Sequence, residues 1–168
     1  TRSIEKGDLY LALVGDNFDG NSFTEAAASS GAIAAIVSRE VQSLLPVLRV
    51  ADTHVALGKI ANLNRRRSDA KVVALTGSQG KTTVKEMLGA ILSDAAETLA
   101  TQANLNNTIG VPLTLLQIEE KHRYVVIEMG ANKAGEIAFS VTATEPDIAL
   151  ITNASPAHIE GFGSLQGI

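Results

Sequence analysis

The chain has 168 residues, of which 45% are hydrophobic, and its 14 basic and 18 acidic side chains leave a formal net charge of −4. This length is enough to bury a substantial core in one domain or in two small ones. The negative charge argues against a nucleic-acid partner, and an aromatic content of 4% argues against base-stacking platforms. The absence of cysteine excludes disulfides, thiolate metal sites and cysteine nucleophiles.

Membrane and secretion signals are also missing from the sequence. No run of about 18 apolar residues could span a bilayer. The first six residues lack the apolar core of a signal peptide. We therefore expect a cytoplasmic α/β protein with small-molecule partners, no nucleic acid and no membrane span.

The first part of the chain alternates strand-like and helix-like stretches. Apolar runs predict strands at residues 9–14, 32–37 and 45–50. Between the first two strands we expect a short helix capped by Asn21 or Ser22, because the side chains of these residue types accept hydrogen bonds from the first helical N–H groups.

The next predicted helix begins after a cap at Asp52 or Thr53 and ends in three arginines at residues 65–67. Cations at that place lie near the negative end of the helix dipole. A solvated helix end is the ordinary interpretation, and an anion site is the alternative. The polar break at residues 68–70 predicts a domain boundary, which gives domains 1–68 and 69–168.

The remainder of the chain follows a regular strand–loop–helix pattern. Strands are predicted at 71–75, 98–101, 124–129 and 148–152, and helices at 81–94, 111–117 and 134–143. The apolar runs at 124–129 and 148–152 are typical of buried parallel strands. On the helix at 81–94, a stripe that includes Met87 and Ile91 is expected to pack on the sheet. The pattern predicts an open parallel sheet with helices on both faces.

The strongest chemical signal is the segment at residues 76–83, which follows a buried strand and opens an amphipathic helix. Its glycines allow a tight turn that brings backbone N–H groups onto phosphate oxygens, and the helix N-terminus favours an anion. Lys81 would reach the β- and γ-phosphates, and the Thr82 hydroxyl would face Mg²⁺. Leu75 departs from the general phosphate-loop pattern, which has glycine there. The candidate ATP-binding residues are Gly77, Ser78, Gln79, Gly80, Lys81, Thr82 and Thr83.

Glu128 is the second candidate, because it ends the apolar run at 124–127. Strands of a parallel sheet end at one edge, so this carboxylate is expected near the phosphate loop. Hard cations prefer oxygen ligands, and Glu128 could hold Mg²⁺ directly or through water. Without that neighbour, an acid at a strand end would be solvated or would cap a helix.

Two further segments are expected at the same edge. Residues 153–158 follow the strand at 148–152, and His158 could ligate a metal or orient phosphate, although a surface histidine is the ordinary interpretation. Residues 104–107 contain three asparagines, whose neutral amides suit sugar, phosphate or peptide contacts. A purely structural turn is the alternative there, because asparagine tolerates left-handed backbone.

Several of these segments together resemble the Mur ligase family. The motifs that carry the resemblance are Thr76–Thr82, Asn104–Pro112, Glu128–Asn132 with Gly135–Ile137, Asn153–Ser164 and, upstream, Gly7–Leu13, Asp19–Gly20 and Phe23. The shortened phosphate loop is this family's own variant, which accounts for Leu75. The resemblance covers essentially the whole chain, and it includes four ordered motifs at compatible spacing.

The resemblance implies a fold, a reaction and roles for individual residues. It implies a small uridine-binding (UDP-sugar) module followed by a P-loop-type ATPase domain with a mostly parallel sheet. The implied enzyme is an ATP-dependent ligase of peptidoglycan precursor synthesis that joins D-Ala-D-Ala to UDP-MurNAc-tripeptide through an acyl phosphate. Lys81, Glu128 and His158 would be catalytic, and Thr82, Glu128 and His158 would bind Mg²⁺. Asn106 and Asn107 would contact substrate or nucleotide, and Arg2 would belong to the uridine site.

The resemblance also implies that the chain is a fragment truncated at both ends. It opens inside the family's uracil motif and stops before the family's carbamylated lysine and C-terminal domain, so we expect it not to ligate alone. Three alternatives remain at this point: a sister ligase or folylpolyglutamate-synthase relative, a small-molecule kinase or other P-loop NTPase, and a non-catalytic nucleotide-binding module.

Overall fold

A computed structural model describes residues 3–156 and 159–167 of the chain. The chain divides into two compact units, Thr1–Leu57 and Gly58–Ile168, and helix α2 (Thr53–Arg67) contains the boundary. Both units are α/β, and the sheets are mostly parallel, as the sequence predicts. No helix in the described ranges has the length and hydropathy that a bilayer span requires.

Unit 1, residues 1–57, contains a parallel three-stranded sheet and a two-residue hairpin. The sheet has the order β1-β4-β5, and the hairpin pairs β2 with β3. The bounds are β1 Leu9–Leu11, β2 Val14–Gly15, β3 Phe18–Asp19, β4 Ala34–Val37 and β5 Val47–Arg49. The predicted strand at 9–14 is therefore two strands, because the chain turns at Leu13, whose carbonyl accepts from Gly20 N at 2.8 Å.

The first helical segment begins differently from the prediction. It consists of a 3₁₀ turn, η1 (Gly20–Phe23), followed by α1 (Thr24–Ser29). Its cap is Asp19, whose side chain accepts from the Asn21 backbone N–H at 2.9 Å. Asn21 is instead buried: its side-chain amide donates to the Ser38 hydroxyl and accepts from the Ser38 N–H, directly after β4. The prediction of an Asn21 or Ser22 cap was therefore wrong. Asp19, Asn21 and Ser22 are all residue types that can cap a helix, and here the Asn21 side chain is occupied by its buried contacts with Ser38.

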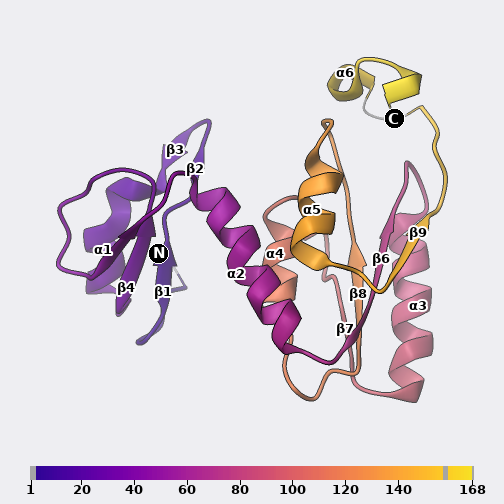
Figure 1. Ribbon diagram of the computed structural model, residues 1–168, viewed down its shortest axis with the longest axis horizontal. Helices are drawn as coiled ribbons and strands as arrows, with labels where there is room; N and C mark the ends of the chain where they lie inside the picture. The colour runs from indigo at the N-terminus through magenta and orange to yellow at the C-terminus, as the bar shows by residue number, and fades with distance from the viewer. Residues whose placement is uncertain (1–2, 157–158, 168) are drawn as a thin grey trace. The chain divides into compact units, whose positions relative to one another are not determined.

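Unit 2, residues 58–168, contains a four-stranded parallel sheet with the order β7-β8-β6-β9. Helix α3 lies on one face and α4 and α5 on the other (Figure 1). The first strand, β6, lies between β8 and β9. The connection that leaves β6 runs to β7 on one side, and the connection that leaves the neighbouring β8 runs to β9 on the other, so the connections reverse direction between β6 and β8. Ligands of open parallel sheets bind at the carboxyl ends of strands beside such a reversal. The bounds are β6 Lys71–Thr76, α3 Lys81–Ala95, β7 Thr98–Ala100, α4 Gly110–Leu115, β8 Tyr124–Glu128, α5 Glu136–Thr144, β9 Ile148–Ile151, α6 Ile159–Phe162 and η2 Leu165–Gly167.

The core of unit 2 lies between the sheet and the helices α2, α4 and α5. It is formed by buried apolar side chains from both layers: Ala61, Ala70, Val72, Ala74, Leu99, Val111, Leu115, Ile118, Val125, Ile127, Met129 and Ala143. Successive strand residues face opposite sides, so Leu75, Val126 and Glu128 point to the other face, where α3 packs. Glu128 is therefore directed toward the start of α3.

Two predictions about apolar faces were wrong. On α3, Met87 and Ile91 are 60% and 64% exposed, whereas Lys85 and Gly89 face the sheet. The run at 148–152 forms an edge strand whose four residues are all exposed, so it is not a buried strand among the described residues. Hydropathy shows that a side chain is apolar, but strand order and helix rotation decide whether anything covers it.

The three arginines at the end of α2 are not simply solvated. The Arg65 guanidinium is largely buried and donates to the carbonyls of Thr144 and Glu145 and to the Asp147 carboxylate. Arg66 pairs with the Glu145 carboxylate. These bonds cap the C-terminus of α5, whose last carbonyls would otherwise lack partners. Two of the three cations are therefore structural.

Candidate phosphate-binding site

The segment between β6 and α3 forms a loop that only glycine can build at two positions. Gly77 has φ +138°, and a Cβ there would lie 2.1 Å from the Thr152 hydroxyl oxygen. Gly80 has φ +78° and is the residue that precedes α3. Both conformations are strained for other L-residues. The two glycines therefore allow the backbone to follow this path.

The loop is braced by the segment that follows β9. Asn153 accepts from the Ser78 N–H through its backbone carbonyl at 3.0 Å and from the Gln79 N–H through its side-chain oxygen at 3.1 Å. The Thr152 hydroxyl donates to the Gln79 carbonyl at 2.7 Å. Residues 153–156 thus lie beside the loop, as expected from the parallel sheet.

The start of α3 is arranged for an anion. No side chain caps this helix, and its first turn contains no acidic residue. Helix N-termini usually attract carboxylates, because their free N–H groups carry partial positive charge. The Lys81 ammonium lies in the same place and donates to the Gly77 carbonyl at 2.6 Å. The free N–H groups and this cation together favour an incoming phosphate.

Glu128 lies under the loop, and it is 1% exposed. Its Oε1 accepts from the Asn106 side-chain amide at 2.8 Å and from the Thr82 hydroxyl at 3.2 Å. Its Oε2 is buried and has no hydrogen-bond partner among the residues that the structure describes. The structure therefore brings Thr82, Asn106 and Glu128 together at one point.

This arrangement fits a hard cation. No ion pair to Glu128 occurs among residues 3–156 and 159–167. A buried carboxylate without a cationic partner is costly, and a bound cation would relieve that cost. Within the same ranges no cluster of three or more histidine or acidic side chains could hold a metal alone. Mg²⁺ is commonly bound by one or two carboxylates, with phosphate oxygens and waters completing its shell.

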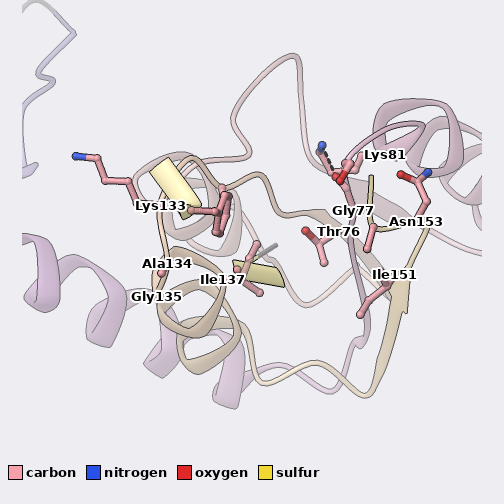
Figure 2. Close-up of a pocket in the computed structure, with 14 residues that line it drawn as sticks. Thr76, Gly77, Lys81, Lys133, Ala134, Gly135, Ile137, Ile151 and Asn153 are labelled. Atoms are coloured by element: carbon pink, nitrogen blue, oxygen red, sulfur yellow. Dashed lines mark hydrogen bonds between the residues drawn. The ribbon is translucent and has the colours of Figure 1, made fainter. Parts of the chain in front are cut away.

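A cavity of about 390 Å³ opens beside the loop. Figure 2 shows Gly77, Lys81 and Asn153 on one side of it and Lys133, Ala134 and Gly135 on the other. Its described lining includes two lysines and no carboxylate. Its charge suits an anion such as a nucleotide phosphate, and its apolar lining would suit a ring.

Three of the site residues predicted from the sequence are not among those that the structure places at the phosphate loop and Glu128. The Asn107 side-chain oxygen accepts from the N–H groups of Ile109 and Gly110, at 3.1 and 2.7 Å, and so caps α4. Arg2 and His158 lie outside the described residues. The roles given to these three residues stay predictions.

Sequence reasoning missed Lys85, Gly130 and Thr152. Lys85 is 2% exposed, lies one turn after Lys81 on α3 and pairs with the Glu86 carboxylate. The sequence contained one indication that Lys85 is buried, namely its position next to the apolar residues on one face of that helix. Gly130 approaches the Asn106 side chain, and Thr152 fills the space that Gly77 leaves.

Comparison with known proteins gives two family matches that together cover the chain. Residues 75–168 match the Mur ligase middle domain, and residues 1–94 match the Mur ligase family catalytic domain. Over all of its length the chain is 51% identical to UDP-N-acetylmuramoyl-tripeptide–D-alanyl-D-alanine ligase from Escherichia coli (strain K12), of which it covers 37%.

Solved structures give the same result. MurF from Acinetobacter baumannii is 46% identical with a TM-score of 0.95, and the match covers 99% of this chain and 37% of that one. MurF from Thermotoga maritima in complex with ADP is 32% identical with a TM-score of 0.92, over 99% of this chain and 39% of that one. The chain thus spans less than two fifths of the length of these relatives. Two domain matches, 51% identity along the full chain and a phosphate loop in its structural context place this chain in the Mur ligase family.

Proposed function

We propose that this chain forms the nucleotide-binding part of a cytoplasmic ATP-dependent ligase that adds D-alanyl-D-alanine to UDP-N-acetylmuramoyl-tripeptide. The observation that carries the proposal is the 51% identity, over every residue of the chain, to the Escherichia coli ligase of that name. The chain covers 37% of the length of that ligase. We therefore propose both substrates by similarity to the relative.

The phosphate loop supports ATP as the nucleotide. A relative with a TM-score of 0.92 was solved in complex with ADP. We propose that the free N–H groups at the start of α3 hold the phosphates and that Lys81 leaves the Gly77 carbonyl to neutralise γ-phosphate charge. Lys81 is then the catalytic cation of this loop.

Thr82 and Glu128 would hold Mg²⁺ beside the phosphates. When bound, the ion supplies charge neutralisation of the β- and γ-oxygens. The chain's contribution is to keep the Glu128 carboxyl group buried next to the Thr82 hydroxyl. His158 is proposed for a second ion, and Arg2 and the domain 1–68 for the uridine moiety.

The reaction that we propose is the one that membership of the Mur ligase family implies. A carboxylate oxygen of the tripeptide attacks the γ-phosphorus, ADP leaves, and an acyl phosphate results. The amine of D-alanyl-D-alanine then attacks the acyl carbon, and phosphate leaves. Positioning and charge neutralisation are the main demands of such steps, and the loop, Lys81 and the buried carboxylate meet them.

The first test is nucleotide binding by the chain itself. Titration calorimetry with a non-hydrolysable ATP analogue and Mg²⁺ should show binding that Lys81→Ala weakens by about tenfold or more, because a charge-assisted contact to the γ-phosphate is lost. Lys121→Ala is the matched control, since that lysine is exposed and pairs with Glu119. Equal affinities for the wild-type chain and Lys81→Ala would contradict the assignment of Lys81.

The second test is ligation by a chimera. The Escherichia coli ligase, with its matching segment replaced by this chain, should add D-alanyl-D-alanine to UDP-N-acetylmuramoyl-tripeptide. Lys81→Ala in that chimera should lower the rate about 100-fold or more, equivalent to about 3 kcal/mol of transition-state stabilisation. A folded chimera that binds ADP but prefers another UDP-linked acceptor would favour a sister ligase. One that binds ADP and ligates nothing would favour a binding module.

A further inference from the structure

Asn106 ties the loop between β7 and α4 to the end of β8 through two hydrogen bonds. Its side-chain amide donates to Glu128 Oε1 at 2.8 Å, and its backbone carbonyl accepts from the Gly130 N–H at 2.8 Å. One residue thus contacts Glu128 and the backbone two residues beyond it. The short spacing leaves the Asn106 side chain little freedom.

The two donors on Glu128 are chemically different. The Thr82 hydroxyl has lone pairs and can turn them toward a cation, so its bond to Glu128 is exchangeable. The Asn106 N–H group can only donate, and it cannot ligate a cation. When Thr82 turns to a metal ion, Asn106 is the side chain that continues to hold Glu128 Oε1.

Rotation about the last bond of a glutamate side chain is intrinsically broad. A donor fixed on Oε1 removes that freedom and determines where Oε2 lies. Oε2 is the buried oxygen that has no partner within residues 3–156 and 159–167. The hydrogen bond from Asn106 therefore sets the orientation of the whole carboxylate.

Gly130 makes room for this contact. A Cβ at Gly130 would lie 3.2 Å from Asn106 Cγ and Oδ1 and 3.3 Å from Nδ2. The φ of Gly130 is not in the left-handed region, so alanine suits the backbone there. A methyl group at this position would crowd the Asn106 amide, which would have to shift to make room for it.

We propose that Asn106 is a positioning residue of the cation site: it holds the Glu128 carboxylate in the orientation that binds a divalent cation, and Gly130 admits it. This role differs from the substrate or nucleotide contact expected of Asn106 from the sequence. The inference rests on the proposed function for the identity of the nucleotide. Groups that orient metal ligands in this way change metal affinity by about 10- to 100-fold when removed.

The experiment uses Mn²⁺ as a paramagnetic probe, measured by electron paramagnetic resonance with and without ADP. Asn106→Ala should weaken Mn²⁺ binding in the presence of ADP by about 10- to 100-fold. ADP affinity without metal and the thermal midpoint should change little. Gln102→Ala, an exposed position on the same loop, is the control and should leave all three measurements unchanged.

A double-mutant cycle tests whether Gly130 influences Mn²⁺ binding through the Asn106 side chain. Gly130→Ala should weaken Mn²⁺ binding in the wild-type background, because its methyl group displaces the Asn106 amide. In the Asn106→Ala background it should have no further effect, because the displaced group is gone. Equal effects of Gly130→Ala in both backgrounds would overturn the inference.

The remaining outcomes separate this inference from the proposed function. Equal losses of metal-free ADP binding and of Mn²⁺ binding in Asn106→Ala would make Asn106 a nucleotide or structural contact, which overturns the inference alone. A wild-type chain that binds no ADP would overturn the proposed function, and Mn²⁺ binding without nucleotide would then decide the role of Asn106. A wild-type chain that binds neither ADP nor Mn²⁺ would overturn both.

Discussion

In unit 2, twelve buried apolar residues form one core between the sheet and its helices, whereas the matching cluster in unit 1 has three, Ala12, Ala35 and Val37. Unit 1 depends more on polar contacts. Asn21, which is 2% exposed, bonds to Asp19 and to Ser38, and the Thr53 hydroxyl donates to the Ala12 carbonyl. Short strands offer few inward-facing apolar side chains, so a small sheet needs polar bonds to specify its structure.

The same comparison applies to buried polar atoms without partners. In the described residues of unit 1 there are none, whereas unit 2 has three, on Glu128, Ser140 and Thr144. Of these, only Glu128 is ionisable, and it lies at the phosphate loop. Among the described residues, unit 1 pairs its buried polar side-chain atoms, and unit 2 leaves one oxygen of a buried carboxyl group unpaired beside the phosphate loop.

Ile127→Ala should have the largest effect on stability. Ile127 is fully buried in the core of unit 2, and its truncation should cost about 2–5 kcal/mol through lost burial and a cavity. Urea unfolding measures the loss, and hydrogen exchange resolved by segment locates it. A loss of protection mainly within residues 1–57 would contradict the assignment of this side chain to the core of unit 2.

Asn21→Ala should have the next largest effect, in unit 1. The substitution leaves the Ser38 N–H without its acceptor, at a cost of about 1–3 kcal/mol. Asn17→Ala, at an exposed position nearby, should stay within about 0.5 kcal/mol. If the two variants unfold at the same urea concentration, the polar network does not stabilise unit 1.

Arg65→Ala tests the polar contacts of unit 2. Arg65 is largely buried and donates to several carbonyls and to Asp147, so its loss should cost about 1–3 kcal/mol. Arg66→Ala breaks an exposed pair with Glu145 and should cost about 0–1 kcal/mol. Thermal or urea unfolding of the two variants compares them directly, and a larger loss for Arg66→Ala would reverse our interpretation.

Acid should have the smallest effect. A backbone hydrogen bond from Val72 holds the pKa of the Asp147 carboxyl below its ordinary value, with the Lys71 and Arg65 cations adding to it. A lowered folded-state pKa gives a stabilisation that is complete above the unfolded pKa of about 4 and is lost as pH falls through the folded pKa. The urea midpoint should therefore fall more steeply below pH 4 in the wild-type chain than in Asp147→Asn. Parallel curves would contradict the shift.

The pH comparison extends to unit 1. The Asn21 amide, with Arg39 and the Asn21 N–H, also lowers the pKa of the Asp19 carboxyl. Asp19→Asn should therefore flatten the acid dependence in the same direction, and segment-resolved exchange should show this in residues 1–57. A response confined to unit 2 would show that the Asp19 contacts contribute nothing measurable.

Much of this protein was determined by local sequence. A strand, a glycine-containing loop and an amphipathic helix follow one another at residues 71–95, and they predicted the phosphate loop because each signal depends only on near neighbours. The order of the remaining strands and helices in unit 2 followed for the same reason. Glu128 was predicted at the loop because all parallel strands end at one edge.

Only the tertiary structure decided which surfaces are covered and which side chains meet. Strand order placed β9 at an edge and left its apolar side chains exposed. Helix rotation buried Lys85 and exposed Met87. The bond between Asn106 and Glu128 joins residues 22 positions apart on separate elements. Such contacts depend on the three-dimensional path of the chain, because periodicity describes one element at a time and contains no information about the element that will lie against it.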